Sequence, residues 1–107
     1  MTLEEAADLA AKAGEAYGEY VYRVKENEFL LKALFSAKFV ELDDGPTSRL
    51  EHLAKASKSY QMLSSQAASD LREAGKRKVA YENAIRQWET IRTNDVRDRQ
   101  EKKIFGG

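Results

Sequence analysis

The sequence predicts an all-α protein in which two long antiparallel helices form a helical hairpin. Two stripes of residues with alternating steps of three and four, the spacing of a coiled coil, run along most of the chain. The only proline among the 107 residues lies in the one convincing turn, and the 34% of charged residues suits long helices exposed to water. We treat residues 1–107 as a single domain.

The first helix is expected from about residue 3 to about residue 40. Thr2 and Glu5 have the spacing of a capping box, in which the hydroxyl accepts a bond from a helical amide and the carboxylate reaches back. Glu19 with Arg23, and Glu28 with Lys32, are favourable pairs one turn apart. The stripe of this helix comprises Leu3, Ala6, Ala10, Ala13, Tyr17, Tyr20, Val24, Asn27, Leu31 and Leu34.

A turn is expected at residues 42–48, followed by a second helix from about residue 49 to about residue 103. Pro46 cannot donate to a helix that began upstream, and Ser48 with Glu51 supplies a second capping box. Gly75 and the segment 93–95 are the places where this helix could bend. Its stripe comprises Leu50, Leu53, Ser57, Tyr60, Ser64, Ala67, Leu71, Ala74, Lys78, Tyr81, Ile85 and Trp88.

The second helix is longer than the first, which predicts a dimer. At about 1.5 Å per residue the helices measure about 57 Å and about 82 Å, so the segment after about Ile85 projects past the first helix. Covering each of its large apolar side chains, Ile104 and Phe105 included, is worth about 1.5–3 kcal/mol. We therefore expect a second copy to complete a dimeric helical bundle. The expected interface residues are Tyr81, Ile85, Trp88, Ile91 and Val96.

Small and aromatic residues of the first helix also favour helix packing. Ala10, Gly14 and Gly18 recur one turn apart, which lets a second helix approach closely, either within the hairpin or from a partner. Aromatic residues spread around more than one face, as expected of a bundle with more than two helices. They are Tyr17, Tyr20, Tyr22, Phe29, Phe35 and Phe39.

The charge is balanced overall but unevenly placed, with −5 in residues 1–48 and +5 in residues 49–107. Attraction between the two arms is the favoured explanation, and a basic surface for an acidic partner or nucleic acid is the alternative. Acidic residues interleave the basic ones near the C-terminus and no base-reading motif is present, so nucleic acid is not favoured. The residues that would make such contacts are Arg72, Lys76, Arg77, Arg92, Arg97, Arg99, Lys102 and Lys103.

We predict no catalytic, cofactor or metal site, and therefore no enzyme. The chain has no cysteine and one histidine, His52, and it lacks a glycine-rich phosphate loop. No apolar run approaches the roughly 20 residues of a membrane span. We expect a cytoplasmic protein that does not associate with membranes.

Three segments resemble small helical-hairpin proteins of tailed phages, which are often encoded near single-strand annealing and exonuclease genes. They are the Ala-, Glu- and Tyr-rich first helix, the segment from Gly45-Pro46-Thr47-Ser48-Arg49 to Ala54-Lys55-Ala56, and the segment from Ile85 to Asn94 with its charged continuation. The resemblance implies a phage origin more than any particular activity.

The sequence thus predicts a non-enzymatic protein-interaction module of phage origin, an accessory to phage DNA recombination or metabolism. Two alternatives stay open. One is a nucleic-acid-binding accessory that uses the basic second helix. The other is an inhibitor of a host defence complex, in which the acidic first helix acts as a decoy surface.

Overall fold

The computed structural model describes residues 1–42 and 47–105, and in these ranges the side chains of all but residues 41, 42, 48, 104 and 105. Three helices follow one another: α1 (Leu3–Leu42), α2 (Thr47–Ala56) and α3 (Lys58–Phe105). None of the described residues belongs to a strand. The predicted all-α class is confirmed, and so are the two long helices.

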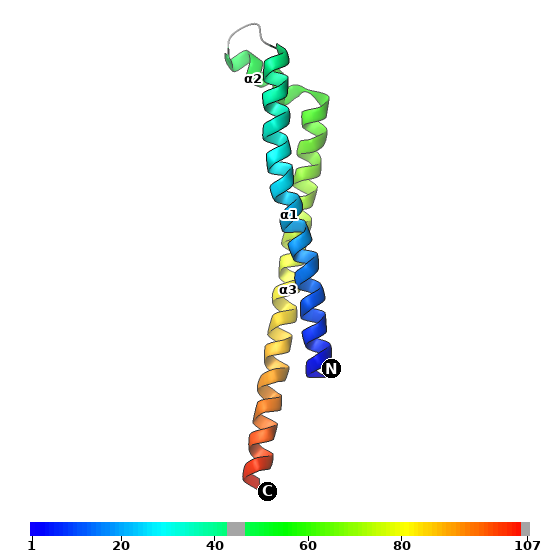
Figure 1. The fold of residues 1–107 in the computed structure, drawn as a ribbon, viewed down its shortest axis with the longest axis vertical. Coiled ribbons are helices and arrows are strands. Elements are labelled where there is room, and N and C mark those ends of the chain that lie inside the picture. The colour runs from blue at the N-terminus through cyan, green and yellow to red at the C-terminus, as the bar shows by residue number, and fades with distance from the viewer. Residues whose placement is uncertain (43–46, 106–107) are drawn as a thin grey trace. The chain divides into compact units, whose positions relative to one another are not determined.

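The chain divides into two compact units, each of which contains part of α1 and part of α3. The first unit consists of Met1–Gly18 and Gly75–Gly107, and the second of Glu19–Ala74. Within the first unit Ala7 lies in the same groove as Trp88, whereas Tyr17 stacks against Tyr81. Residue numbers therefore rise along α1 as they fall along α3, so the two helices are antiparallel there (Figure 1).

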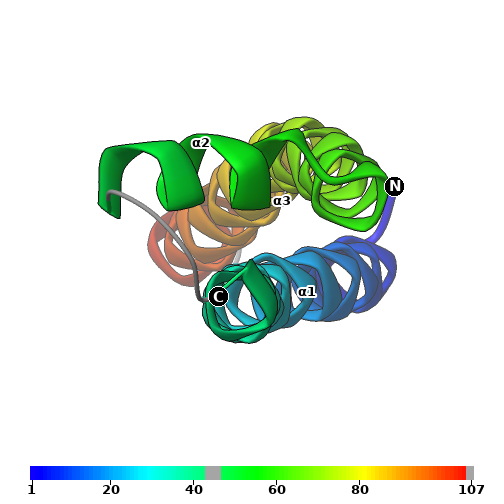
Figure 2. The ribbon, with the colours of Figure 1, turned by 90° about the horizontal axis from the view of Figure 1, so that it is seen from above.

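The second unit repeats this antiparallel relationship and adds α2. Asn27 contacts Asp70, and Phe35 lies against Tyr60 with ring centroids 6.5 Å apart. In this unit α2 runs across α1 and α3 instead of in line with α3 (Figure 2). Leu50 and Ala54 are its buried residues, so the short helix covers apolar surface with one side.

The start of α1 forms only part of the predicted capping box, because the Glu5 carboxylate accepts from the Thr2 hydroxyl instead of the Thr2 amide. The Glu5 amide donates a 3.1 Å hydrogen bond to the Thr2 hydroxyl, which in turn donates a 3.2 Å bond to the Glu5 carboxylate. The hydroxyl thereby satisfies one of the amides that a helix start leaves without a helical partner. At the other end, α1 extends to Leu42 and α2 begins at Thr47. The rest of the predicted turn (43–46) and the Ser48 side chain of the second capping box lie outside the described residues.

The prediction of one uninterrupted second helix is wrong at Ser57. The Ser57 amide donates to the Ala54 carbonyl at 3.3 Å, which closes α2. The Ser57 hydroxyl then accepts a 3.3 Å bond from the Tyr60 amide, and its carbonyl accepts a 3.0 Å bond from the Gln61 amide. These bonds make Ser57 the N-cap of α3, a position for which serine is among the best residues. By contrast, α3 is helical through both Gly75 and the segment 93–95.

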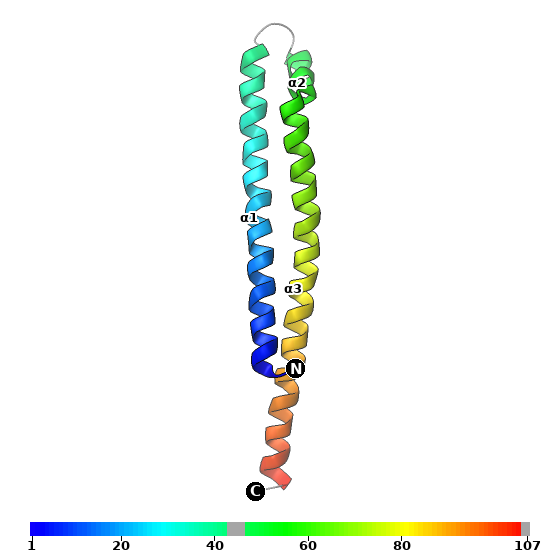
Figure 3. The same ribbon diagram turned by 90° about the vertical axis from the view of Figure 1, so that its right-hand side faces the viewer.

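In the first unit α3 continues past the first residue of α1 (Figure 3), as the unequal lengths predicted. The projecting part begins later than the predicted Ile85, because Ile85 and Trp88 still line a groove with α1. Ile91 is still half-buried, whereas all residues from Arg92 to Lys103 except Asp95 are exposed. The side chains of Ile104 and Phe105, which the prediction also placed in this segment, lie outside the described residues. We call residues 92–103 the uncovered end of α3.

The buried side of α1 agrees with its predicted stripe, because all ten stripe residues are buried or half-buried. The stripe predicted for the second helix is only partly right. Leu53, Ser64, Leu71 and Lys78 are exposed, and Leu71 keeps 61% of its surface. The residues next to three of them in the sequence face inward instead: Ala54, Leu63 and Asp70 are buried or half-buried. We call the contact surface between the packed helices the seam. Between Tyr60 and Ala74, α3 therefore turns Asp70 rather than Leu71 toward α1.

Of the two ion pairs predicted on the α1 surface, one is formed. Arg23 and Glu19 form the expected ion pair at 2.7 Å, and a second pair joins Lys12 to Asp8 at 3.2 Å. The predicted Glu28–Lys32 pair is not formed in the described structure. Such exposed pairs contribute little to stability, so the difference has small consequences for the fold.

Candidate functional site

Three of the five predicted interface residues line one apolar groove in the first unit. Tyr81, Ile85 and Trp88 of α3 form one wall of this groove, which has a volume of about 400 Å³. Small residues of α1 form the opposite wall, so the helices meet without large side chains filling the space between them. These small residues are Ala7, Ala10, Ala11 and Gly14.

Gly14 closes the groove at the Tyr81 end. A Cβ atom at Gly14 would lie only 3.0 Å from Cε1 of Tyr81, so the ring occupies the space that a side chain would need. Tyr81 also stacks against Tyr17, with ring centroids 6.1 Å apart. The predicted close approach of two helices is thus found within the hairpin at Gly14. It is not found at Gly18, where a Cβ atom would meet nothing within 4 Å.

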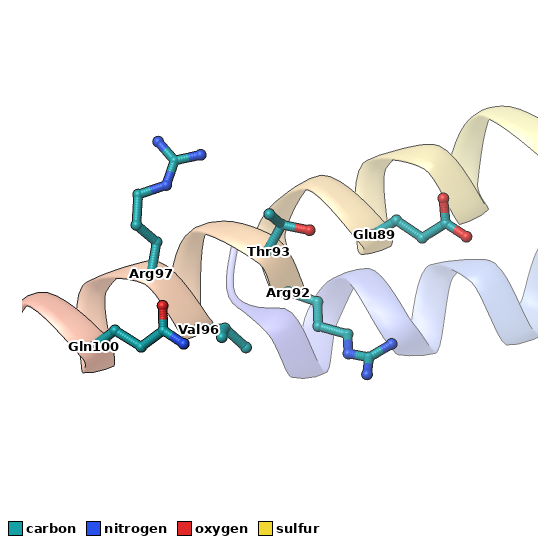
Figure 4. Close-up of a pocket in the computed structure, with 6 residues that line it drawn as sticks. All are labelled: Glu89, Arg92, Thr93, Val96, Arg97 and Gln100. Carbon is teal, nitrogen blue, oxygen red and sulfur yellow. The ribbon is translucent and has the colours of Figure 1, made fainter.

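A second hollow, of about 560 Å³, lies further along α3 and reaches onto the uncovered end. Figure 4 shows Arg97 extending from one edge of α3, with Arg92 and Val96 extending from the opposite edge. Val96 keeps 45% of its surface exposed. The residues that line this hollow are Glu89, Arg92, Thr93, Val96, Arg97 and Gln100.

The two hollows follow each other along one side of α3. Tyr81, Ile85 and Trp88 of the groove are followed by Arg92 and Val96 of the second hollow, in steps of four, three, four and four. Steps of this size keep residues on one side of a helix. At the junction the Arg92 guanidinium lies 5.5 Å from the centroid of the Trp88 ring, a cation–π contact. We call this side of α3, formed by Tyr81, Ile85, Trp88, Arg92 and Val96, the docking stripe. Arg97 extends from the opposite edge of the helix and is not part of it.

Of the predicted interface residues, only Ile91 lines neither hollow, and it is half-buried. The predicted basic contacts are all exposed. Arg92 and Arg97 line the second hollow, whereas the other six line neither of the two hollows.

A buried polar layer in the second unit was missed by the sequence reasoning. The Asn27 side chain donates a 2.7 Å hydrogen bond to Asp70, and the Gln66 side chain donates a second bond of 3.0 Å to the same carboxylate. Asn27 and Asp70 are only 8% and 7% exposed. Asn27 in the first stripe was the available signal, because a buried amide requires a hydrogen-bonding partner on the facing helix.

Charge around this layer also involves Arg23. The Glu19 carboxylate raises the pKa of the Arg23 guanidinium above its ordinary value, and Asp70 adds a smaller effect in the same direction. The buried carboxylate is therefore hydrogen-bonded by two amides and lies within the field of a nearby cation. This arrangement satisfies Asp70 within the chain and leaves it no evident role in binding a ligand.

The described residues contain no group of three or more His, Asp or Glu side chains that could hold a metal ion. Within the same residues, every buried side-chain nitrogen and oxygen has a hydrogen-bond partner. His52 is exposed on α2. None of the helices, over the described residues, is long and apolar enough to cross a membrane.

Comparisons with protein families, curated proteins and solved structures found no match to this chain.

Proposed function

We propose that this protein is a non-enzymatic protein-interaction module that binds a second protein chain along the docking stripe and forms a homodimer. One observation carries the proposal: α3 stays helical past the start of α1, and residues 92–103 are exposed except for Asp95, with no described residue of α1 or α2 over them. The uncovered end continues a helix that is already formed, but most helical stability in proteins comes from the packing of an apolar face. A second chain supplies that packing.

The residues of the stripe suit a protein partner. Trp88, Ile85 and Tyr81 are half-buried, so each keeps apolar surface that a partner could cover. Aromatic residues and arginine are the residue types most enriched where binding energy concentrates in protein interfaces. Trp88 and Arg92 stand side by side in the middle of the stripe.

The biological process follows from the resemblance to small helical proteins of tailed phages. It favours an accessory role in phage DNA recombination or metabolism in the host cytoplasm. In that role the module would join or position other proteins and would carry out no chemistry itself.

The test is the molecular mass in solution of the wild type and of two matched variants, measured by light scattering. Val96→Glu places a charge in the second hollow. Val79→Glu changes a valine of α3 that lies outside both hollows and is somewhat more exposed, at 56% against 45%. We expect a dimer for the wild type and for Val79→Glu, and a monomer for Val96→Glu. A monomeric wild type at tens of micromolar would contradict the proposed dimer.

Nucleic-acid binding is the second candidate, because all eight predicted basic residues are exposed. Such binding depends on counterion release and therefore weakens steeply as salt is raised. Titration of labelled single- and double-stranded DNA at low salt tests it. A steep salt dependence would favour this candidate, and the absence of binding would remove it.

A further inference from the structure

We propose that α2 is a hinged arm that turns about Ser57 between two forms. In the crossed form, which the structure shows, α2 runs across α1 and α3 (Figure 2). In the straight form, α2 continues α3 as one uninterrupted helix. This inference goes beyond the proposed function, because α2 belongs to the second unit whereas the docking stripe belongs to the first.

A single residue separates the two helices. Ser57 lies between Ala56, the last residue of α2, and Lys58, the first residue of α3. The Ser57 hydroxyl accepts a 3.3 Å bond from the Tyr60 amide, a side-chain bond that a continuous helix would replace with a backbone bond. No proline or glycine occurs in residues 47–74. Every backbone amide of this stretch can therefore take part in a continuous helix.

The contact that holds α2 across the other helices is small. Among its described side chains only Leu50 and Ala54 are buried, and Leu53 keeps 40% of its surface exposed. A hollow of about 360 Å³ also lies between α2 and the other two helices, and Phe35 and Tyr60 form part of its lining. The arm therefore has few contacts to lose when it turns away.

The straight form offers the arm another contact. Leu53, Ser57 and Tyr60 follow one another in steps of four and three, so in one continuous helix they share the side that Tyr60 turns toward α1. Leu53 then extends the seam in place of Leu50 and Ala54. Two packings of one sequence that bury similar residues differ little in free energy, which is the condition for a two-state element.

Turning of the arm changes what the second unit presents to solvent. In the crossed form the Lys55 ammonium of α2 lies 5.8 Å from the centroid of the Phe35 ring, and both Phe35 and Tyr60 are half-buried. In the straight form α2 moves away from this place, and both rings gain exposed surface. The arm is thus a cover over the Phe35–Tyr60 pair.

The distance between two spin labels on the full chain distinguishes the forms, because the natural chain has no cysteine that would compete for label. Lys32→Cys and Glu51→Cys place the labels on two exposed residues that line the same hollow in the crossed form. Glu51 precedes Tyr60 by nine residues, and Lys32 precedes the facing Phe35 by three. In the straight form these twelve residues of helical rise separate the labels by about 18 Å along the axis.

Two variants bias the hinge in opposite directions. Ser57→Ala removes the cap of α3, so we expect the ratio of the long to the short distance to rise about fivefold. Lys58→Pro should remove the long distance, because proline suits the first position of a helix but lacks the amide that a continuous helix requires there. Circular dichroism shows whether each variant is folded.

A second label pair provides the control for the hinge. Lys32→Cys with Ser59→Cys joins α1 to the α3 side of Ser57, and both residues are exposed. This pair should give one distance in the wild type and in both variants. Each labelled sample is diluted with unlabelled protein, so that distances between copies do not contribute.

Double electron–electron resonance on frozen samples measures these distances. A long distance that is present in the wild type, grows in Ser57→Ala and vanishes in Lys58→Pro supports the hinge. The short distance alone in both the wild type and Ser57→Ala would overturn it. A long distance that Lys58→Pro leaves unchanged would also overturn it, because the movement would then not require a continuous helix.

Discussion

The Asn27 side-chain amide donates a 2.7 Å hydrogen bond to the Asp70 carboxylate across the seam between α1 and α3, where both residues are buried. A buried amide at one stripe position is known to specify the register of a helix pair at some cost in stability. Here the pair holds Asp70 inward and leaves Leu71 outward. The relationship therefore decides which side of α3 faces α1 in the second unit.

Removing one member of this pair should be costly. Asp70→Ala leaves the buried Asn27 amide without its acceptor, so we expect the free energy of unfolding to fall by about 1–3 kcal/mol. Urea unfolding followed by circular dichroism measures it. In a double-mutant cycle with Asn27→Ala, the two changes should couple by at least about 0.5 kcal/mol. Purely additive effects would show that the bond contributes nothing.

The register of α3 predicts opposite behaviour for two leucines of the same helix. Leu63 is half-buried in the seam, whereas Leu71 is mostly exposed. Leu63→Ala should cost about 2 kcal/mol of unfolding free energy, and Leu71→Ala should change it by no more than about 0.5 kcal/mol. Denaturant unfolding of the two variants side by side makes the comparison. The reverse order would mean that Leu71 faces α1 after all.

Two glycines of α1 provide a second matched pair. Gly18→Ala adds a methyl group in open space and should stabilise the protein by about 1 kcal/mol, the difference in helix propensity. Gly14→Ala places its methyl 3.0 Å from the Tyr81 ring, and the resulting strain should outweigh the same gain, with a net loss of about 1 kcal/mol. Thermal unfolding measures both. Equal stabilisation by the two alanines would contradict the tight contact at Gly14.

The Ser57→Ala substitution tests the helix break. The change in unfolding free energy that it causes has one sign if the helix is broken at Ser57 and the opposite sign if the helix is continuous, as predicted. As the N-cap of α3, Ser57 satisfies the Tyr60 amide, so Ser57→Ala should lower the unfolding free energy by about 1 kcal/mol. In an uninterrupted helix the same change would raise stability, because alanine is the better helix former. Ser59→Ala, two residues later inside α3, is the control and should be neutral or slightly stabilising. A more stable Ser57→Ala variant would contradict the break.

The sequence was sufficient to predict α1 well, because its stripe repeats without interruption and its start has a recognisable cap. It was less informative for the second half of the chain. Apolar spacing favoured Leu71 for the seam, but the partner that decides the register is Asn27, a polar residue on the other helix. The break at Ser57 depends on how α2 packs across the second unit, and the local sequence permits a helix on either side of it.

Part of the predicted interface could be inferred from helix lengths and helical spacing in the sequence. Helix lengths alone indicated that α3 extends past α1, and helical spacing placed Tyr81, Ile85 and Trp88 on one side. The opposite wall of the groove is made of alanines and Gly14, which carry no strong signal of their own.

The most direct test of the central claim uses Trp88, the only tryptophan of the chain, which lies at the junction of the two hollows. Acrylamide quenching of its fluorescence should be measured across a dilution series that spans the dissociation constant found by sedimentation. A partner chain on the docking stripe shields the indole, so the account predicts clearly weaker quenching at high protein concentration than at low. Quenching that stays the same while the mass doubles would place the interface elsewhere and contradict the account.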